Sequence, residues 1–132
     1  MADFLVSLFS RNTDERGEIV ADCIFCKIGN KEIPSTVVYE DDDFLAFRDI
    51  NPVAPTHVLL IPKKHYSSLL DLSEDDADLM GRMMTLVPKI VKQLGIDEGF
   101  RVVINTGAKG GQTVFHLHIH LLGGRVFNWP PG

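Results

Sequence analysis

Imidazole and apolar side chains alternate in the stretch Thr113-Val114-Phe115-His116-Leu117-His118-Ile119-His120-Leu121-Leu122. In an extended strand, side chains two residues apart point to the same face with roughly 7 Å between them. The alternation therefore predicts a strand over residues 114–122 in which the three imidazoles form one row. We expect the interleaved apolar residues to form the opposite row and to pack on a helix: Phe115, Leu117, Ile119 and Leu121.

Four more strands and one long helix are predicted by the rest of the sequence. Short runs of β-favouring residues predict strands over residues 37–39, 44–47, 57–61 and 101–105, the first three as an antiparallel meander. Ser73 and the three acidic residues after it indicate a helix start, and apolar residues then recur at helical spacing up to Gly95. We expect Pro88 to kink or break this helix, because proline removes a backbone donor. With a short helix near the cysteines, the sum is an α+β fold.

Length, charge and hydropathy limit the class of protein. The chain has 132 residues, about one domain's worth, and its net charge of −5 has the wrong sign for binding a nucleic-acid backbone. No apolar run approaches the roughly 20 residues that span a bilayer, so we expect no membrane partner and a cytoplasmic protein. We expect residues 1–21 to be an extension without chemistry and residues 22–132 to form the domain.

Two chemistries use a row of imidazoles. One is a metal centre, as in a metal-dependent oxygenase or hydrolase, but no carboxylate lies between Thr106 and Pro131 to complete it. The other is phosphoryl or nucleotidyl transfer, in which one imidazole attacks phosphorus and its neighbours donate to the charged oxygens. The segment Gly110-Gly111-Gln112-Thr113 offers backbone N–H groups and a hydroxyl that suit a phosphate. A nucleophilic ring also needs an acceptor for its other nitrogen, and we expect a backbone carbonyl to supply it.

The two cysteines are spaced Cys23-x-x-Cys26. In a cytoplasmic protein this spacing indicates half of a metal site or a pair of redox thiols rather than a structural disulfide. The alternative is that both are simply small buried apolar residues.

The histidine stretch resembles the signature of the histidine triad family, in which three histidines alternate with apolar residues. Other segments resemble the same family in order and spacing, and together they cover about residues 22–132: Ile33-Pro34, Glu40-Asp41-Asp42, Leu45-Ala46-Phe47, Asp49-Ile50, Ala54-Pro55-Thr56-His57 and Ile61-Pro62-Lys63-Lys64-His65. The end of the chain, Gly123-Gly124-Arg125 and Trp129-Pro130-Pro131-Gly132, is similar to one branch, the histidine triad nucleotide-binding proteins.

This resemblance implies a fold, a partner and a reaction. It implies a homodimer in which two five-stranded antiparallel sheets join into one ten-stranded sheet, with a purine-nucleotide pocket in each subunit. It also implies hydrolysis of purine nucleoside phosphoramidates through a nucleotidyl-histidine intermediate, with no organic cofactor and no metal in the chemistry. The alternatives are a dinucleoside polyphosphate hydrolase and a nucleotide-binding regulatory or scaffold protein with incidental hydrolysis.

The resemblance also implies a role for each matching residue. His118 is the nucleophile, His57 supports the triad, and His120 and the backbone around Gly111 contact the α-phosphate. Asn105 and Thr113 lie near that phosphate, Asp49 binds the ribose, and Trp129 reaches the neighbouring subunit's site. The apolar walls around the base are Ile24, Phe25, Ile28, Phe47 and Ile50.

A structural zinc is implied by the resemblance to bacterial-type members of the family. The four ligands would be Cys23, Cys26, His65 and His116. In that case His116 orients the triad rather than reacting.

Overall fold

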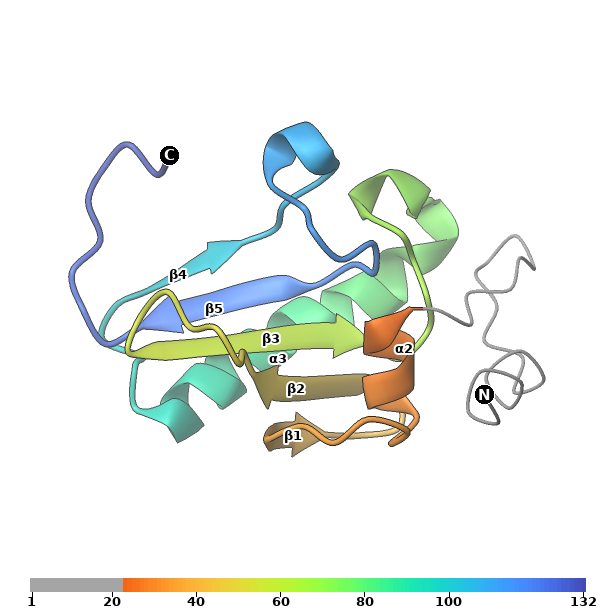
Figure 1. Cartoon of the computed structure of the whole chain (residues 1–132), viewed down its shortest axis with the longest axis horizontal. Helices are drawn as coiled ribbons and strands as arrows, with labels where there is room; N and C mark the ends of the chain where they lie inside the picture. Colours follow the sequence, from red (N-terminus) through yellow and green to blue (C-terminus); the bar gives the residue numbers. More distant parts are fainter. Residues whose placement is uncertain (1–22) are drawn as a thin grey trace.

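The computed structural model describes residues 23–132, and the predicted extension over residues 1–21 lies outside the described residues. The described chain forms one sheet with strand order β1-β2-β3-β5-β4, in which every neighbouring pair is antiparallel (Figure 1). The strands are β1 (Val37–Glu40), β2 (Phe44–Arg48), β3 (Thr56–Pro62), β4 (Phe100–Val103) and β5 (Ile119–Gly123). The long helix is α3 (Ala77–Leu94) and the short one is α2 (Ile24–Gly29), with 3-10 turns η1 (Leu69–Asp71), η2 (Glu74–Asp76) and η3 (Ala108–Gly110). The predicted α+β fold with five antiparallel strands is confirmed.

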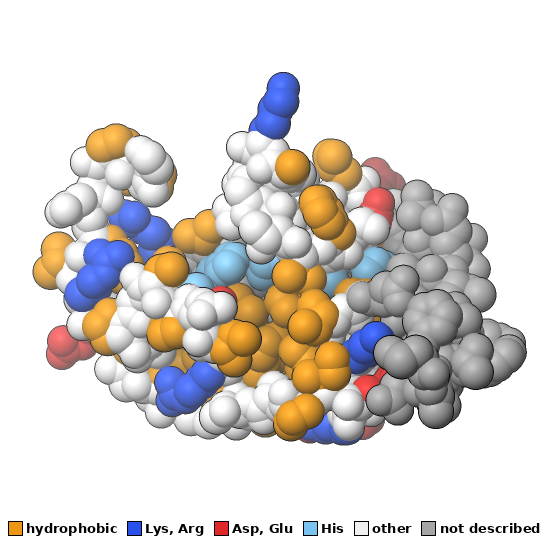
Figure 2. Space-filling view, in the orientation of Figure 1, with side chains coloured by type: hydrophobic (Ala, Val, Ile, Leu, Met, Phe, Trp, Pro, Cys, Tyr) orange, Lys and Arg blue, Asp and Glu red, His pale blue; other side chains and the backbone are white. Residues whose placement is uncertain are grey.

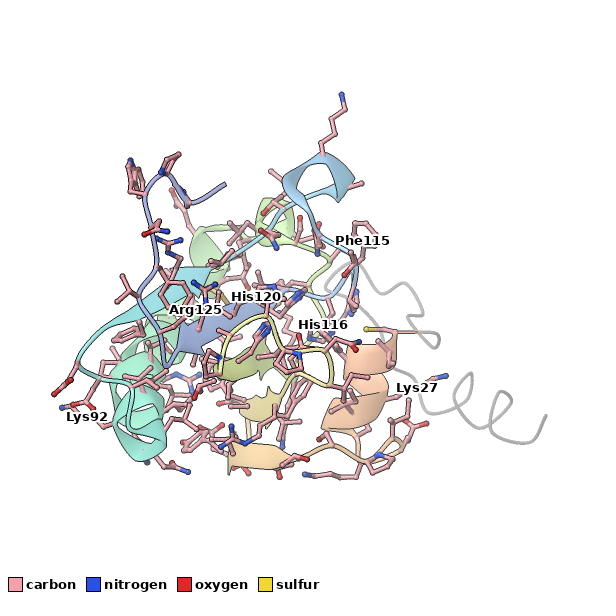
Figure 3. All side chains as sticks on the ribbon, turned by 60° about the vertical axis from the view of Figure 1, so that its left-hand side comes forward. Lys27, Lys92, Phe115, His116, His120 and Arg125 are labelled. Atoms are coloured by element: carbon pink, nitrogen blue, oxygen red, sulfur yellow. The ribbon has the colours of Figure 1, made fainter. Side chains whose placement is uncertain are left out.

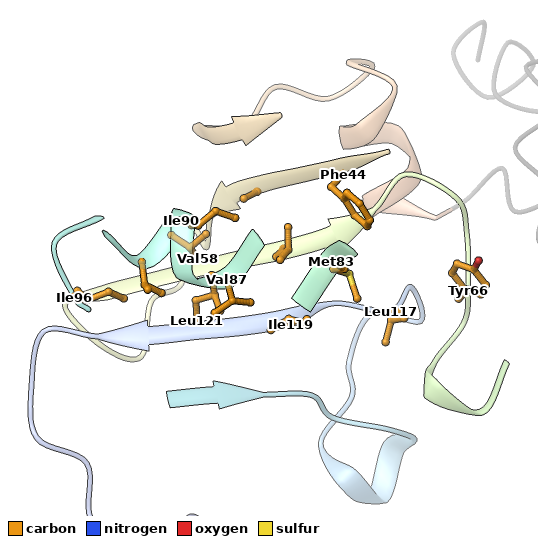
Figure 4. Close-up of a cluster of buried hydrophobic side chains, with 13 residues drawn as sticks. Phe44, Val58, Tyr66, Met83, Val87, Ile90, Ile96, Leu117, Ile119 and Leu121 are labelled. Atoms are coloured by element: carbon orange, nitrogen blue, oxygen red, sulfur yellow. The ribbon is translucent and has the colours of Figure 1, made fainter. Parts of the chain in front are cut away.

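The central strands β2 and β3 are buried on both faces, and successive side chains alternate between two apolar clusters. On one face Phe44, Ala46, Val58 and Leu60 pack with Met83, Val87 and Ile90 of α3 (Figure 4). On the other face Leu45, Phe47, Leu59 and Ile61 pack with Phe25 and Ile28 of α2. The sheet therefore separates a structural core beneath α3 from a second apolar surface beneath α2.

The predicted cap at Ser73 forms, but it begins the 3-10 turn η2, which leads directly into the long helix α3. The Ser73 N–H donates to Asp76 Oδ2 at 2.9 Å, and the Ser73 side chain accepts a backbone N–H in return. The helix runs without a break through Pro88 to Leu94 and ends at Gly95 with φ 75°. The predicted break at Pro88 is wrong, because this residue lies on the exposed side, where water can bond the carbonyl that it leaves unpaired. No helix within residues 23–132 has the length and hydropathy to cross a bilayer.

The last strand is shorter than predicted. It begins at Ile119, not at Val114, because the backbone before it bonds to other parts of the chain. The Leu117 N–H donates to the Tyr66 carbonyl at 2.7 Å, and the Val114 carbonyl accepts from Gln112. Leu117, Ile119 and Leu121 do join the core under α3, but Phe115 is 52% exposed and does not join them (Figure 3).

Candidate functional site

The five histidines of the chain form one continuous row beside the apolar cluster that packs against α2. The histidine side chains that reach the surface form a pale-blue band in Figure 2. Ring centroids are 4.9 Å apart for His65 and His116, 4.9 Å for His118 and His120, and 5.2 Å for His120 and His57. The Phe25 ring bridges the remaining step, at 6.1 Å from His116 and 5.0 Å from His118. The predicted row therefore forms, although His116 and His118 precede the strand.

The tautomer of His118 is fixed by the backbone. Its Nδ1 lies 2.6 Å from the His116 carbonyl oxygen, which only accepts, so this nitrogen carries the proton and Nε2 keeps a lone pair. The predicted carbonyl acceptor is thus present. Burial lowers the pKa of His118 below its usual value, although the same hydrogen bond opposes the shift. The ring is held neutral, and its Nε2 carries no proton.

His57 and His120 form a second unit beside His118. His57 Nε2 lies 2.9 Å from His120 Nδ1 and 3.4 Å from Asp49 Oδ2. Burial, followed by repulsion from His118 and His57, lowers the pKa of His120 to about 4. Burial also lowers the pKa of His57, against the opposing charge of Asp49. The two rings are therefore neutral at physiological pH.

A cavity of about 330 Å³ opens between α2, the end of β2, the middle of β3 and the histidine row. This volume lies within the usual range for small-molecule sites. Of the predicted site residues, the cavity is lined by Ile24, Phe25, Ile28, Phe47, Asp49, Ile50, Thr113, His118 and His120. Its lining also includes residues that the sequence analysis did not assign: Ile33, Pro34, Ser35, Arg48, Asn51, Leu59 and Val114. Leu59 had a usable signal in the sequence, since it lies two residues after His57 in a predicted strand and therefore faces the same side.

Several predicted contacts lie outside this lining. Gln112 is buried, and its side chain accepts from the Gly107 N–H and donates to the carbonyls of Ser67 and Val114, so it braces the loop instead of facing a phosphate. The N–H groups of Gly111 and Gln112 donate to carbonyls within the same loop and are already used.

Three other predicted residues are placed as follows. Asn105 lies beside Gly111, about 3.8 Å from the position of an added Cβ, and not in the lining. Trp129 lies in the C-terminal tail and is 82% exposed. Ile50 lies in the loop after β2 and contributes to the cavity lining, although it is 91% exposed. Both side chains are left uncovered in the single chain.

Cys23, Cys26, His65 and His116 converge at the other end of the row, with their candidate ligand atoms within 4.8 Å of one another. The sulfurs lie 3.3–3.5 Å from the facing Nδ1 atoms, and the two Nδ1 atoms are 3.1 Å apart. A tetrahedron with ordinary zinc–sulfur and zinc–nitrogen bonds has edges of about 3.6 Å and about 3.3 Å. The spacing therefore fits one ion of this size.

The surroundings of the cluster also suit a metal. His116 Nε2 donates to the Pro62 carbonyl at 2.8 Å, which leaves Nδ1 with a lone pair facing the sulfurs. The Cys26 N–H donates to Cys23 Sγ at the start of α2. The hydrogen bond from Cys26, with further hydrogen bonds to the two histidines, holds the pKa of Cys23 far below its usual value, whereas the same bond and burial raise the pKa of Cys26. Cys23 is thus the thiolate of the free cluster, and a bound cation would favour the thiolate of Cys26 as well.

Comparison with known proteins agrees with this architecture. A model of the HIT domain matches residues 30–127. A 14 kDa zinc-binding protein of Brassica juncea is 56% identical over 113 residues, which cover 84% of this chain and 100% of the relative.

Solved structures resemble the chain in the same way. A HIT family hydrolase from Legionella pneumophila Philadelphia 1 matches with a TM-score of 0.81 and 50% identity, covering 83% of this chain and 99% of that one. A histidine triad nucleotide-binding protein from Candida albicans matches with a TM-score of 0.71 and 36% identity, covering 82% of each chain. By sequence and by fold, the chain belongs to the HIT domain family.

Proposed function

We propose that the chain is a hydrolase that releases a purine nucleoside monophosphate from an amine, through a covalent nucleotidyl intermediate on His118. Two similar structures support a hydrolase that binds nucleotides, since one is named a hydrolase and the other a nucleotide-binding protein. The observation that carries the proposal is the His118 ring, which lines the cavity with Nδ1 bonded to the His116 carbonyl and Nε2 left as a lone pair.

The cavity suits a nucleotide from end to end. Apolar side chains from α2, β2 and β3 surround a space that fits a flat base, with Phe25, Phe47 and Leu59 among them. Asp49 stands at the cavity edge, where its carboxylate accepts hydrogen bonds from ribose hydroxyls. A phosphate attached to that ribose then lies against His118 and His120.

The reaction proceeds in two displacements. In the first, the His118 Nε2 lone pair bonds to the α-phosphorus, the bond from phosphorus to the amine nitrogen breaks, and the amine leaves after taking a proton from solvent. The Nδ1–H of the modified ring stays bonded to the His116 carbonyl, which stabilises its positive charge. In the second, water bonds to phosphorus and releases a proton to solvent, the P–Nε2 bond breaks and the ring regains its lone pair. The products are the nucleoside monophosphate and the free amine.

Zinc is the metal that we propose for the four-residue cluster. Two thiolates and two imidazoles at tetrahedral spacing are a structural donor set, and relatives at 56% and 54% identity are named zinc-binding proteins. Cys23, Cys26, His65 and His116 would hold the ion and tie α2 to the end of β3 and to the histidine stretch. When bound, the ion would supply structural cross-linking, and the reaction uses no metal.

The functional unit that we propose is a homodimer of domain 22–132. β4 is an edge strand of the described sheet and exposes Phe100 and Val102. A second copy joined along β4 would make a ten-stranded sheet and bring the exposed Trp129 toward the partner's cavity. We place the protein in the cytoplasm, where free cysteines such as Cys23 and Cys26 persist as thiols and metal ligands.

Mass spectrometry of protein quenched during turnover of adenosine and guanosine phosphoramidates tests the reaction. The expected result is an adduct of one nucleoside monophosphate on His118, absent from a His118→Asn variant with the same melting temperature and metal content. If a dinucleoside polyphosphate is hydrolysed faster than the phosphoramidates, the leaving group is a nucleotide and not an amine, and the protein is a dinucleoside polyphosphate hydrolase. Turnover by the His118→Asn variant, or an adduct on another residue, would refute the mechanism.

A further inference from the structure

We propose that the backbone N–H of Val53 locks the tautomers of His57 and His120, so that His120 is a neutral hydrogen-bond donor toward the cavity. The use of that donor rests on the proposed function, because it would meet a phosphate oxygen. The tautomers themselves are a property of the free protein.

The first link is the bond from the loop after β2 to His57. The Val53 N–H donates to His57 Nδ1 at 3.1 Å. A backbone amide can only donate, so Nδ1 must offer its lone pair. A neutral imidazole carries one ring proton, which for His57 therefore sits on Nε2.

The second link passes this constraint to His120. His57 Nε2 and His120 Nδ1 are 2.9 Å apart, a distance that accommodates one hydrogen but not two. Since His57 supplies that hydrogen, His120 Nδ1 accepts it and His120 carries its own proton on Nε2. This Nε2 is buried and has no partner within residues 23–132, although His120 lines the cavity. An unpaired buried donor is costly, and a ligand oxygen would satisfy it.

The same geometry disfavours three other roles for the cluster formed by Asp49, His57 and His120: a metal site, a protonated His57 and a proton relay. A metal on His57 Nε2 would need the lone pair there and would move the proton to Nδ1, against the Val53 N–H. Protonation of His57 would create the same clash. A proton relay through His57 would end at an amide that does not release its proton. The unit therefore serves as a fixed donor.

Two backbone groups thus give neighbouring rings opposite roles. The His116 carbonyl makes His118 present a lone pair, and the Val53 amide makes His120 present an N–H. One ring can attack phosphorus while the other binds an oxygen of the same group.

Nitrogen-15 NMR of the wild-type protein at neutral pH tests the lock directly. The expected spectra show His57 and His120 as neutral rings protonated on Nε2, and His118 as a neutral ring protonated on Nδ1. A proton on Nδ1 of His57 or His120, or a doubly protonated ring in either, would overturn the proposal. The measurement needs no substrate, so the two proposals can fail separately. If the spectra show the expected tautomers but the protein does not turn over phosphoramidates, the proposed function is refuted and the tautomer lock stands.

A pair of variants tests whether the amide is the cause. Val53→Pro removes the N–H, whereas Val53→Ala keeps it and trims a side chain that is 64% exposed. The proline variant is expected to shift the ratio of the His57 tautomers roughly two- to tenfold and to lower kcat within the same range, as loss of one hydrogen bond allows. The alanine variant is expected to keep the wild-type tautomers. A folded proline variant with wild-type tautomers would overturn the proposal, and if it does not fold, the wild-type spectra decide.

Discussion

Removing the proposed zinc should release α2 from the sheet while the rest of the domain stays folded. Two of the four candidate ligands, Cys23 and Cys26, lie at the start of this helix or within it. The helix has only six residues, too few to be stable alone in water. Its attachment therefore depends on the cluster and on the side chains that it buries.

The magnitude can be worked from the structure. Fixing the backbone of six residues costs roughly 6 kcal/mol at about 1 kcal/mol each. Phe25 and Ile28, each 7% exposed, return roughly 1.5–3 kcal/mol apiece by leaving water. The two sums nearly cancel, so without the ion α2 should be detached in a large fraction of molecules.

Hydrogen exchange measured by mass spectrometry, before and after chelation, checks this expectation. The amides of α2 should lose protection after chelation, while those of β3 and α3 keep it. Ligand binding should weaken as well, because Ile24, Phe25 and Ile28 line the cavity. Lys31→Ala is the control, since Lys31 lies just after α2, its side chain forms an exposed ion pair with Glu40, and its backbone bond to Ile28 is kept in the variant. Continued protection of α2 after verified loss of the metal would refute the reasoning.

Three further perturbations have defined outcomes. Acid should destabilise the fold progressively below pH about 6.5, because burial lowers the pKa of His57, His118 and His120 in the folded protein. Below that pH the unfolded chain therefore binds more protons than the folded one. Urea midpoints that stay constant from pH 7 to pH about 4 would contradict this. Gln112→Ala should lower the free energy of unfolding by about 1–3 kcal/mol, because it leaves the Gly107 N–H and the carbonyls of Ser67 and Val114 without this partner. Unchanged stability with a raised KM would instead indicate that Gln112 contacts the substrate. Gly123→Ala should cost about 1–3 kcal/mol in thermal denaturation, since its Cβ would lie 2.7 Å from Ile96. Gly81→Ala, with open space around it, is the matched control.

Much of the fold follows from local patterns that a sequence displays. The alternation around His118 predicted correctly that Leu117, Ile119 and Leu121 face the core, because a strand-like backbone sends neighbours to opposite sides. It was wrong for Phe115, which lies four residues before β5 and is exposed. Ser73 and Asp76 marked the start of η2, the turn that leads into α3, because a capping box involves only residues three apart. The resemblance then predicted most of the cavity walls, which come from short segments of matching order.

Other features depend on groups that are distant in the chain. The strand over residues 114–122 was predicted too long because Tyr66 takes the Leu117 N–H out of the ladder. Gln112 looked like part of a phosphate loop, and its burial among backbone partners on two segments shows that it braces that loop. Neither contact has a local signal in the sequence.

The sequence by itself determined that five histidines and two cysteines are present and that three imidazoles share a row. Only the tertiary structure decided what each ring can do. A histidine's role depends on which nitrogen holds the proton, and that is set here by the carbonyls of Pro62 and His116 and the amide of Val53. The Pro62 carbonyl reaches its ring from 54 residues away, and the other two groups lie two and four residues from theirs but meet them only because of the backbone path of the folded chain.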